Sequence, residues 1–383
     1  MIRKEINYDI CIIGAGIMGA SIARELGKYH TNVVILEKNP VVADETTTGN
    51  SGLIHGGFDA KIGTLNAKLN VLGKIRYEEW FKQLNFPYKR IDSLVLAFNE
   101  YEKGELEVLY NRGLSNGLQA HEMKILNFEE VQKREPNIST DVVGALLCNS
   151  SVLIDPVALS KKLLSNAIKN NVELKLNWKV ASIDTQSKDF MKVRNSDGDV
   201  IKAKIIINCA GHWGDEIAKF TGATDFTLKR RRGEYRVLER FSQPQINSVL
   251  FMVPTVYGKG VLVAPMLDGR TLVGPTAEEG ISRDETRLIT TNKYNEIGEI
   301  GTRIVPGLKM EHTCYHFSGS RAIWKENDDF YINFSSQNDH FINVAGIKSP
   351  GISSAPALAD YVIEMIKTKI KLTNKLNWNP IEN

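Results

Sequence analysis

The sequence predicts an α/β protein in which a parallel, doubly wound sheet is interleaved with an α+β domain built on an antiparallel sheet. An apolar run over 8–13 leads directly into the glycine pattern of residues 14–19, which is typical of a strand buried on both faces that turns into a helix. Two later apolar runs, 205–210 and 341–345, also end at a glycine. Residues 226–322 instead contain many short strand-like runs. A Rossmann-like domain interrupted by a strand-rich domain accounts for these observations.

Length and composition agree with a globular protein of two domains. The chain has 383 residues, well above the roughly 150 residues of a typical single domain. Hydrophobic residues make up 42% and charged residues 24%, as in ordinary globular proteins with a sizeable core. The formal charge of +3 and one basic run at 229–232 do not indicate a nucleic-acid partner, because no aromatic residues are interleaved with that run.

The sequence also bears on location and on metal binding. The N-terminus lacks the apolar stretch and cleavage site of a signal peptide, and no run approaches the roughly 18 apolar residues of a membrane span. We therefore expect a cytoplasmic protein with no transmembrane segment, while peripheral membrane contact and oligomeric state stay open. The four cysteines lie far apart without metal-ligand spacing, so no metal site is expected. Cys11 and Cys209 are expected in the core.

The elements follow in order from the apolar periodicity. We expect strands at 8–13, 32–36 and 93–98, and helices at about 18–29, 65–84, 101–111 and 128–135. Further on we expect a helix from Asp155-Pro156 to 170, strands at 172–176, 179–183, 205–211 and 341–346, and helices from about 215 and over 355–369. Turns are expected at Asp197-Gly198, Gly258-Lys259-Gly260 and Asp268-Gly269. We assign residues 1–87, 148–222 and 325–383 to the Rossmann-like cofactor domain, and residues 88–147 and 223–324 to a substrate-binding domain.

The pattern Gly14-x-Gly16-x-x-Gly19 has the chemistry of a dinucleotide site. The first glycine permits a tight turn, the second lets the backbone approach a pyrophosphate, and the third allows close packing of helix on strand. The helix N-terminus then faces the phosphate charge. Glu37 follows the next strand, at about the spacing where a carboxylate binds the adenosine ribose hydroxyls. This context makes dinucleotide binding a specific prediction.

Residues 46–52 favour a flavin over a nicotinamide. A nicotinamide dehydrogenase normally continues with regular βα units, whereas this chain runs into Thr46-Thr47-Thr48-Gly49-Asn50-Ser51-Gly52. Small residues let the backbone line a large planar ring, and hydroxyls can bond to pyrophosphate or flavin. The alternative interpretation is a flexible surface loop. His55 follows directly, and a neutral imidazole there can take the proton of an alcohol while hydride leaves for flavin N5. The alternative is a structural histidine.

At this point the sequence resembles a known group of flavoproteins. The segment N-S-G-x-I-H-x-G at 50–57 resembles the superfamily that includes D-amino-acid oxidase, glycine oxidase and the glycerol-3-phosphate dehydrogenases. Residues 208–215 and 346–351 are similar to its later FAD-contact segments, so the resemblance covers nearly the whole chain. Within the superfamily, the chain is most similar to the short bacterial glycerol-3-phosphate oxidases, on the stretches 251–255, 258–260, 319–321 and 348–351.

The resemblance implies a reaction and a set of substrate contacts. Those enzymes oxidise the C2 hydroxyl of sn-glycerol 3-phosphate to dihydroxyacetone phosphate and pass electrons from FAD to oxygen, which gives hydrogen peroxide. The implied base is His55, and the implied pocket residues are Ser51, Lys259, Arg321 and Ser349. Their chemistry is suitable, because a guanidinium can hold a phosphate bidentately and a lysine supplies a point charge. The alternatives are a surface ion pair for Arg321 and a solvated turn for Lys259.

The expected cofactor is non-covalent FAD, since no cysteine or histidine is placed for covalent attachment. Residues 349–354 precede the last expected helix, whose N-terminal dipole would stabilise negative charge at the N1–C2 edge of the reduced flavin. A simple helix cap is the alternative. The expected cofactor contacts are Gly14, Gly16, Ile17, Met18, Gly19, Glu37, Thr46, Thr47, Ser51, Gly52, Leu53, Val180, Ala210, Gly211, Gly346, Ile347, Lys348 and Ser353.

Two other functions stay open from the sequence. An FAD-dependent oxidase or dehydrogenase of L-2-hydroxyglutarate, or of another 2-hydroxyacid, shares the S-G-x-I-H segment, and Arg321 would then hold a carboxylate. A non-catalytic FAD-binding module is the second alternative, against which the placement of His55 argues. The chain lacks the C-terminal helical extension of the longer membrane-linked dehydrogenases, which favours oxygen over quinone as the electron acceptor without deciding it.

Overall fold

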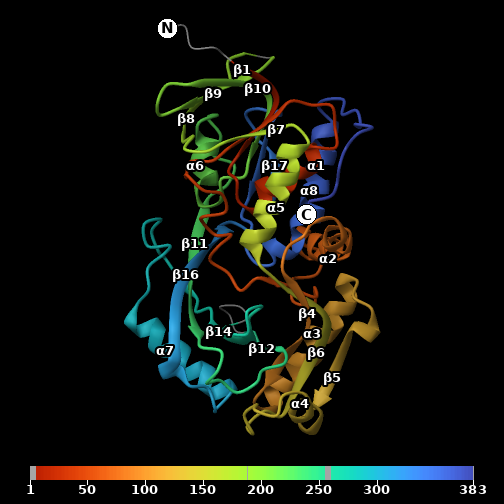
Figure 1. Ribbon diagram of the computed structural model, residues 1–383, viewed down its shortest axis with the longest axis vertical. Coiled ribbons are helices and arrows are strands. Elements are labelled where there is room, and N and C mark those ends of the chain that lie inside the picture. The colour runs from red at the N-terminus through yellow and green to blue at the C-terminus, as the bar shows by residue number, and fades with distance from the viewer. Residues whose placement is uncertain (1–5, 188, 255–259, 383) are drawn as a thin grey trace.

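The computed structural model describes residues 6–187, 189–254 and 260–382. Two sheets lie one above the other along the long axis of the molecule (Figure 1). Within the described ranges, every helix is too short or too polar to cross a lipid bilayer.

The first sheet is mostly parallel, and its main strand order is β17-β18-β10-β1-β2-β7. Its parallel strands are β1 (Ile6–Ile13), β2 (Val33–Leu36), β7 (Val172–Lys175), β10 (Val200–Asn208) and β18 (Phe341–Ala345). At one edge β17 (Tyr331–Phe334) pairs antiparallel with β18. The strands β8 (Val180–Asp184) and β9 (Met191–Asn195) join antiparallel through β10.

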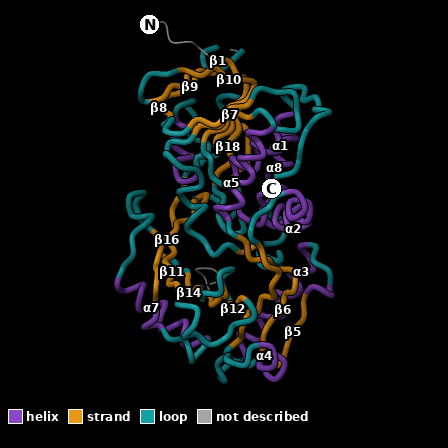
Figure 2. Tube along the Cα trace, viewed as in Figure 1, coloured by secondary structure: helices purple, strands orange, loops and turns teal. Residues whose placement is uncertain are grey.

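Helices cover both faces of this sheet. On one side, α1 (Ile17–Leu26) contacts α5 (Pro156–Lys169) and α8 (Gly351–Lys367), and α2 (Leu65–Gln83) packs on α8 (Figure 2). A short helix, α6 (Gly214–Lys219), follows a 3₁₀ turn over Gly211–Trp213 and contacts β10 and β18. Ile10 and Ile12 belong to the cluster on the α1 side, and Cys11 and Ile13 to the opposite cluster. Successive side chains of β1 are therefore buried on both faces, as its apolar run predicts.

The second sheet is mostly antiparallel, with the order β15-β11-β14-β13-β12-β4-β6-β3. Its strands are β3 (Leu53–Ile54), β4 (Tyr88–Ala97), β6 (Gly144–Ile154), β11 (Leu228–Leu238), β12 (Val249–Met252), β13 (Leu262–Pro265), β14 (Thr271–Gly274) and β15 (Glu278–Glu279), while β5 (Met123–Asn127) pairs with β6 and β16 (Thr313–Trp324) with β11. The helices α3 (Glu100–Asn116), α4 (Phe128–Arg134) and α7 (Thr291–Ile304) pack against these strands, and single 3₁₀ turns cover Ala120–Glu122 and Met310–His312.

The predicted fold class is confirmed, and most expected elements are present. Asp155 caps α5 by accepting from the backbone N–H groups of Val157 and Ala158, both at 2.9 Å, as an Asp-Pro helix start predicts. The reversals at 197–198 and 268–269 join β9 to β10 and β13 to β14. Lys259 and most of the turn at 258–260 lie outside the described residues.

Several elements differ from the expectation, among them one strand and two helices. The long strand β6 and the helix α7 were not expected, and α8 begins at Gly351 rather than at 355. The domain boundaries stay a prediction. Sheet pairing bears on them, because β3 and the end of β6 lie in segments assigned to the cofactor domain but pair within the second sheet.

Candidate active site

A cavity of about 750 Å³ lies where the carboxyl ends of the parallel strands meet the second sheet. This volume is within the range of roughly 300–1,000 Å³ that is usual for ligand sites. The residues after β1, β2, β10 and β18 all line it, including Gly14, Glu37, Ala210 and Gly346. Open α/β sheets bind ligands at this edge, where the strand order reverses.

The three glycines of the pattern at residues 14–19 have different roles in the structure. Gly14 has φ +106°, and a Cβ there would lie 2.5 Å from the carbonyl oxygen of Cys209. A Cβ on Gly19 would lie 2.0 Å from the carbonyl oxygen of Gly14. Gly19 therefore sits behind the cavity and brings α1 close to β1, whereas Gly14 and Gly16 line the cavity itself. These are the separate roles that the spacing predicts.

The N-terminus of α1 opens onto this cavity. Gly16 is its N-cap residue and supplies no side-chain cap, and Gly16, Ile17 and Met18 all line the cavity. The hydroxyl of Thr47 accepts from the backbone N–H of Ile17 at 3.1 Å. The backbone donors and the helix dipole fit the negative pyrophosphate of a dinucleotide.

Glu37 connects the glycine turn to the end of β2. Its Oε2 accepts from the backbone N–H of Ala15 and its Oε1 from that of Asn39, both at 2.9 Å. The carboxylate is mostly buried and still borders the cavity. This position is suitable for the ribose hydroxyls that the sequence predicts as its partners.

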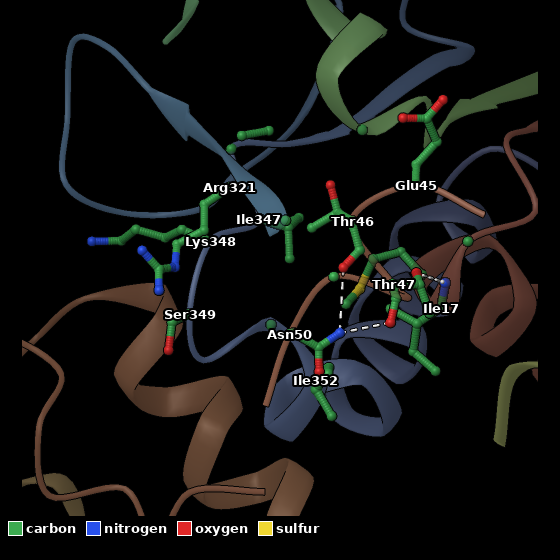
Figure 3. Close-up of a pocket in the computed structure, with 18 of the residues that line it drawn as sticks. Ile17, Glu45, Thr46, Thr47, Asn50, Arg321, Ile347, Lys348, Ser349 and Ile352 are labelled. Atoms are coloured by element: carbon green, nitrogen blue, oxygen red, sulfur yellow. Dashed lines mark hydrogen bonds between the residues drawn. The ribbon is translucent and has the colours of Figure 1, made fainter. Parts of the chain in front are cut away.

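The segment 46–52 forms a wall of the cavity, so its interpretation as a flexible surface loop is wrong. The Asn50 amide nitrogen donates to the carbonyl oxygens of Thr47 at 2.6 Å and Thr46 at 3.3 Å, and its Oδ1 accepts from the N–H of Gly52 at 2.8 Å. Thr46, Thr47 and Asn50 lie on one side of the pocket in Figure 3. Ser51 and Leu53 line the cavity, whereas Gly52 sits behind it with φ +63°.

This wall touches the second sheet directly. A Cβ on Gly319 of β16 would lie 1.8 Å from the carbonyl oxygen of Gly49. Next to this contact, the Thr46 hydroxyl donates to the carbonyl oxygen of Ser320 at 2.9 Å and lies 3.0 Å from Nε2 of His212. Since the hydroxyl proton goes to Ser320, Nε2 of His212 donates to Thr46. Burial lowers the pKa of His212 to about 4, so this imidazole is neutral at pH 7.

His55 directly follows β3, at one edge of the second sheet, and lines the cavity. Its backbone N–H donates to the hydroxyl of Ser353 at 2.8 Å, and its ring lies 5.9 Å from that of Phe251. Ser353 is fully buried in the first turn of α8. The structure thus places Ser353 behind His55, away from the cavity surface where a cofactor contact was expected.

Arg321, Lys348 and Ser349 lie together on the other side of the pocket (Figure 3). Arg321 comes from β16, and the other two residues come from the turn between β18 and α8. The Lys348 ammonium pairs with Asp328. Val180, Gly211 and Ile347 also line the cavity, as expected. Lys259 lies outside the described residues, so its role stays a prediction.

Several cavity residues were missed from the sequence. Arg231 and Tyr235 line the cavity from β11, and Phe251 and Leu262 from β12 and β13. Period-2 alternation along β11 is the signal that could have found the first two, because residues 231, 233 and 235 share one face. Burial raises the pKa of the Tyr235 hydroxyl, and Arg321 beside it opposes part of this rise.

The chain belongs to the FAD-dependent oxidoreductase family. A family model described as FAD dependent oxidoreductase matches residues 9–365. The residues around the cavity fit this cofactor, because the N-terminus of α1, the glycine turn and the acid that follows β2 all border one cavity.

Its relatives include proteins of nearly the same length. A glycerol 3-phosphate oxidase of Mycoplasma genitalium is 42% identical over 98% of each chain. A structure of dithionite-reduced L-alpha-glycerophosphate oxidase from Mycoplasma pneumoniae with FAD bound has a TM-score of 0.96 and 39% identity, and 98% of each chain is covered. A glycerol 3-phosphate dehydrogenase of Caloramator mitchellensis is 41% identical over 97% of this chain and 77% of its own length. A mitochondrial L-2-hydroxyglutarate dehydrogenase of Bos taurus is 29% identical over 73% of this chain and 63% of its own.

Proposed function

We propose that this protein oxidises sn-glycerol 3-phosphate to dihydroxyacetone phosphate, with FAD as its cofactor and oxygen as its electron acceptor. The observation that carries the proposal is the continuity of one cavity from the dinucleotide-binding turn to His55 and Arg321. The full-length relatives named for glycerol 3-phosphate support the substrate, at 42% and 41% identity.

The residues around the cavity have separate tasks in this reaction. Bound FAD supplies the acceptor for the hydride that leaves C2 of the alcohol. The His55 imidazole takes the hydroxyl proton, and the bond between its backbone and Ser353 fixes its position. Arg321, with Lys259 as a predicted partner, holds the phosphate. Ser51 and Ser349 are proposed to donate hydrogen bonds to the substrate.

The first turn of α8 has an electrostatic task. Gly351 and Ile352 line the cavity at the N-terminus of this helix. Because a helix N-terminus carries partial positive charge, it favours the negative charge that a flavin gains on reduction. With FAD bound in the cavity, oxygen would take up the two electrons of the alcohol oxidation together with two protons, which gives hydrogen peroxide.

The main competing substrate is a 2-hydroxyacid, since a relative named L-2-hydroxyglutarate dehydrogenase is 29% identical. A carboxylate in place of the phosphate would then lie against Arg321. An anaerobic substrate screen separates these possibilities. We expect sn-glycerol 3-phosphate to bleach the flavin absorbance and L-2-hydroxyglutarate to leave it unchanged, and admission of air to release hydrogen peroxide. The reverse pattern would select the hydroxyacid, and bleaching by neither would favour a binding module.

Two further expectations stay predictions with simple tests. Acid precipitation should release the yellow cofactor into the supernatant, because no covalent attachment is expected. Cell fractionation should find the protein in the cytoplasm, and a membrane-bound fraction would indicate peripheral contact.

A further inference from the structure

Two arginines lie directly opposite each other in the second sheet. In the antiparallel ladder of β11 and β16, Arg231 is the register partner of Arg321, and both residues line the cavity. Directly opposite residues have Cβ atoms about 4.5–5.5 Å apart, and like charges at such a pair are destabilising. An anion bound between the two guanidiniums would remove this repulsion.

The neighbouring pairs on the same face also contribute residues to the cavity. The next pair on this face is Gly233 and Gly319, and the one after it is Tyr235 and Phe317, whose ring centroids lie 4.6 Å apart in a stacked arrangement. Two arginines, two glycines and two aromatic rings thus follow one another along the ladder. Of these residues, Gly319 and Tyr235 also line the cavity, and the lack of a side chain at Gly319 lets the Gly49 carbonyl oxygen approach this face.

The charges at this end of the cavity are unequal. Arg231 Nε donates to Glu279 at 2.9 Å, and Lys229 Nζ lies 3.5 Å from the same carboxylate. Among the residues that the structure describes, no carboxylate lies within ion-pair distance of Arg321. Glu279 therefore faces two cations, and the charge of Arg321 is left for a ligand. A phosphate monoester carries about −1.5 to −2 charge at pH 7, which compensates more positive charge than a single carboxylate does.

We propose that Arg231 is a second phosphate-binding residue, which holds the substrate phosphate together with Arg321 and selects a phosphorylated alcohol over a carboxylate-bearing or uncharged one. This proposal rests on the function proposed above. Two guanidinium forks on neighbouring strands match the three terminal oxygens of a phosphate. Glu279 holds the Arg231 side chain in place for this contact.

The test compares Arg231→Met with Lys229→Met, which removes the same charge beside Glu279 from a residue that does not line the cavity. Anaerobic flavin reduction is followed against the concentration of sn-glycerol 3-phosphate and, separately, of glycerol. We expect Arg231→Met to raise the half-saturating concentration of sn-glycerol 3-phosphate by about tenfold or more, the usual scale for a lost charge-assisted hydrogen bond. Flavin reduction by glycerol in Arg231→Met should match that in the unsubstituted protein. In Lys229→Met, flavin reduction by either substrate should match the unsubstituted protein.

Two results would overturn the proposal. One is an unchanged half-saturating concentration in Arg231→Met, and the other is an equal loss with glycerol and with sn-glycerol 3-phosphate. If Arg231→Met does not fold, Arg231→Lys is judged by the same criterion, because it keeps the charge and loses the fork.

A failure of the proposed function would be seen separately, as no reduction of the unsubstituted protein by sn-glycerol 3-phosphate. In that case, the rise in melting temperature on addition of inorganic phosphate would test whether the arginine pair binds an anion. A smaller shift in Arg231→Met than in the unsubstituted protein supports the site, and equal shifts reject it.

Discussion

At the scale of single residues, the position of His55 depends on a buried hydroxyl. Its backbone N–H donates to Ser353 in the first turn of α8, and its ring lies near Phe251 of β12. Its position is therefore set by a helix that packs on the first sheet and by a strand of the second sheet. Because the bond to Ser353 is made by the backbone, it persists whether the imidazole is neutral or protonated, which suits a group that must change its protonation state during turnover.

The first prediction concerns this base. We expect His55→Asn to retain FAD and to reduce its flavin at least about 10²-fold more slowly with sn-glycerol 3-phosphate, the usual scale for a positioned base. Stopped-flow reduction under anaerobic conditions measures the rate. His121→Asn, at an exposed position outside the cavity lining, is the matched control. Reduction at the unsubstituted rate would remove His55 from the mechanism.

At the scale of elements, close helix packing places α8 behind the site. Gly73 lies in α2, and a Cβ there would lie 2.0 Å from the carbonyl oxygen of Ser353. The close contact between α2 and α8 therefore fixes the position of Ser353, which binds the backbone of His55. Tyr77, one turn further along α2, donates from its hydroxyl to the carbonyl oxygen of Ile352 at 2.8 Å, which fixes the same turn.

The second prediction compares two glycines inside helices. A methyl group added at Gly104 of α3 would meet no atom within 4 Å, whereas one added at Gly73 would collide with α8. Gly104→Ala should stabilise the protein by about 0.5–1 kcal/mol through helix propensity. Gly73→Ala gains the same propensity but should destabilise by about 1–3 kcal/mol through overpacking. Urea unfolding with saturating FAD measures both, and equal changes would contradict the packing argument.

The elements that sequence reasoning missed have local physical reasons. The helix α7 contains Gly298 and Gly301, which lower helix propensity. A Cβ on Gly301 would lie 2.8 Å from Val273 of β14. Close packing of α7 on β14 therefore requires glycine at this position, although glycine has a low helix propensity. The strand β6 was missed because it is buried along nearly its whole length and therefore lacks the alternation of a half-exposed strand.

The candidate site was predictable where a local pattern determines the geometry. The glycine turn, Glu37 and the segment 46–52 follow from short-range spacing, and the structure places them around one cavity. Arg231 and Tyr235 depend instead on the register between β11 and β16, which the sequence of either strand alone does not specify. Ser353 was expected in the segment before the last helix, whereas the structure places it in the first turn of α8, where its hydroxyl accepts from the backbone N–H of His55.

At the scale of the whole molecule, a neutral histidine joins three distant segments. His212 follows β10, Thr46 belongs to the cavity wall, and Ser320 belongs to β16. Within the described part of the chain, Nδ1 of His212 is buried and has no hydrogen-bond partner. Protonation at Nδ1 would therefore place a charge and an unpaired donor at the junction of the two sheets.

The third prediction follows from this histidine. Its pKa is about 4 in the fold and about 6.5 in the unfolded chain, so the unfolded chain takes up the proton first as the pH falls. Its contribution to stability is complete above pH 6.5 and is lost as the pH falls from 6.5 to 4. In His212→Gln, the free energy of unfolding should fall less over this range, measured by urea unfolding with saturating FAD. Parallel pH profiles for the two proteins would contradict the prediction.

The contact between Gly49 and Gly319 has a consequence for hybrid enzymes. A side chain at either position would collide with the backbone of the other segment, with 1.8 Å between a Gly319 Cβ and the Gly49 carbonyl oxygen. Residues 46–52 and β16 therefore form a single unit of exchange, although more than 250 positions separate them in the chain. A chimera that takes both segments from one parent should keep its cofactor. A chimera that takes them from parents with different residues at this crossing should lose it.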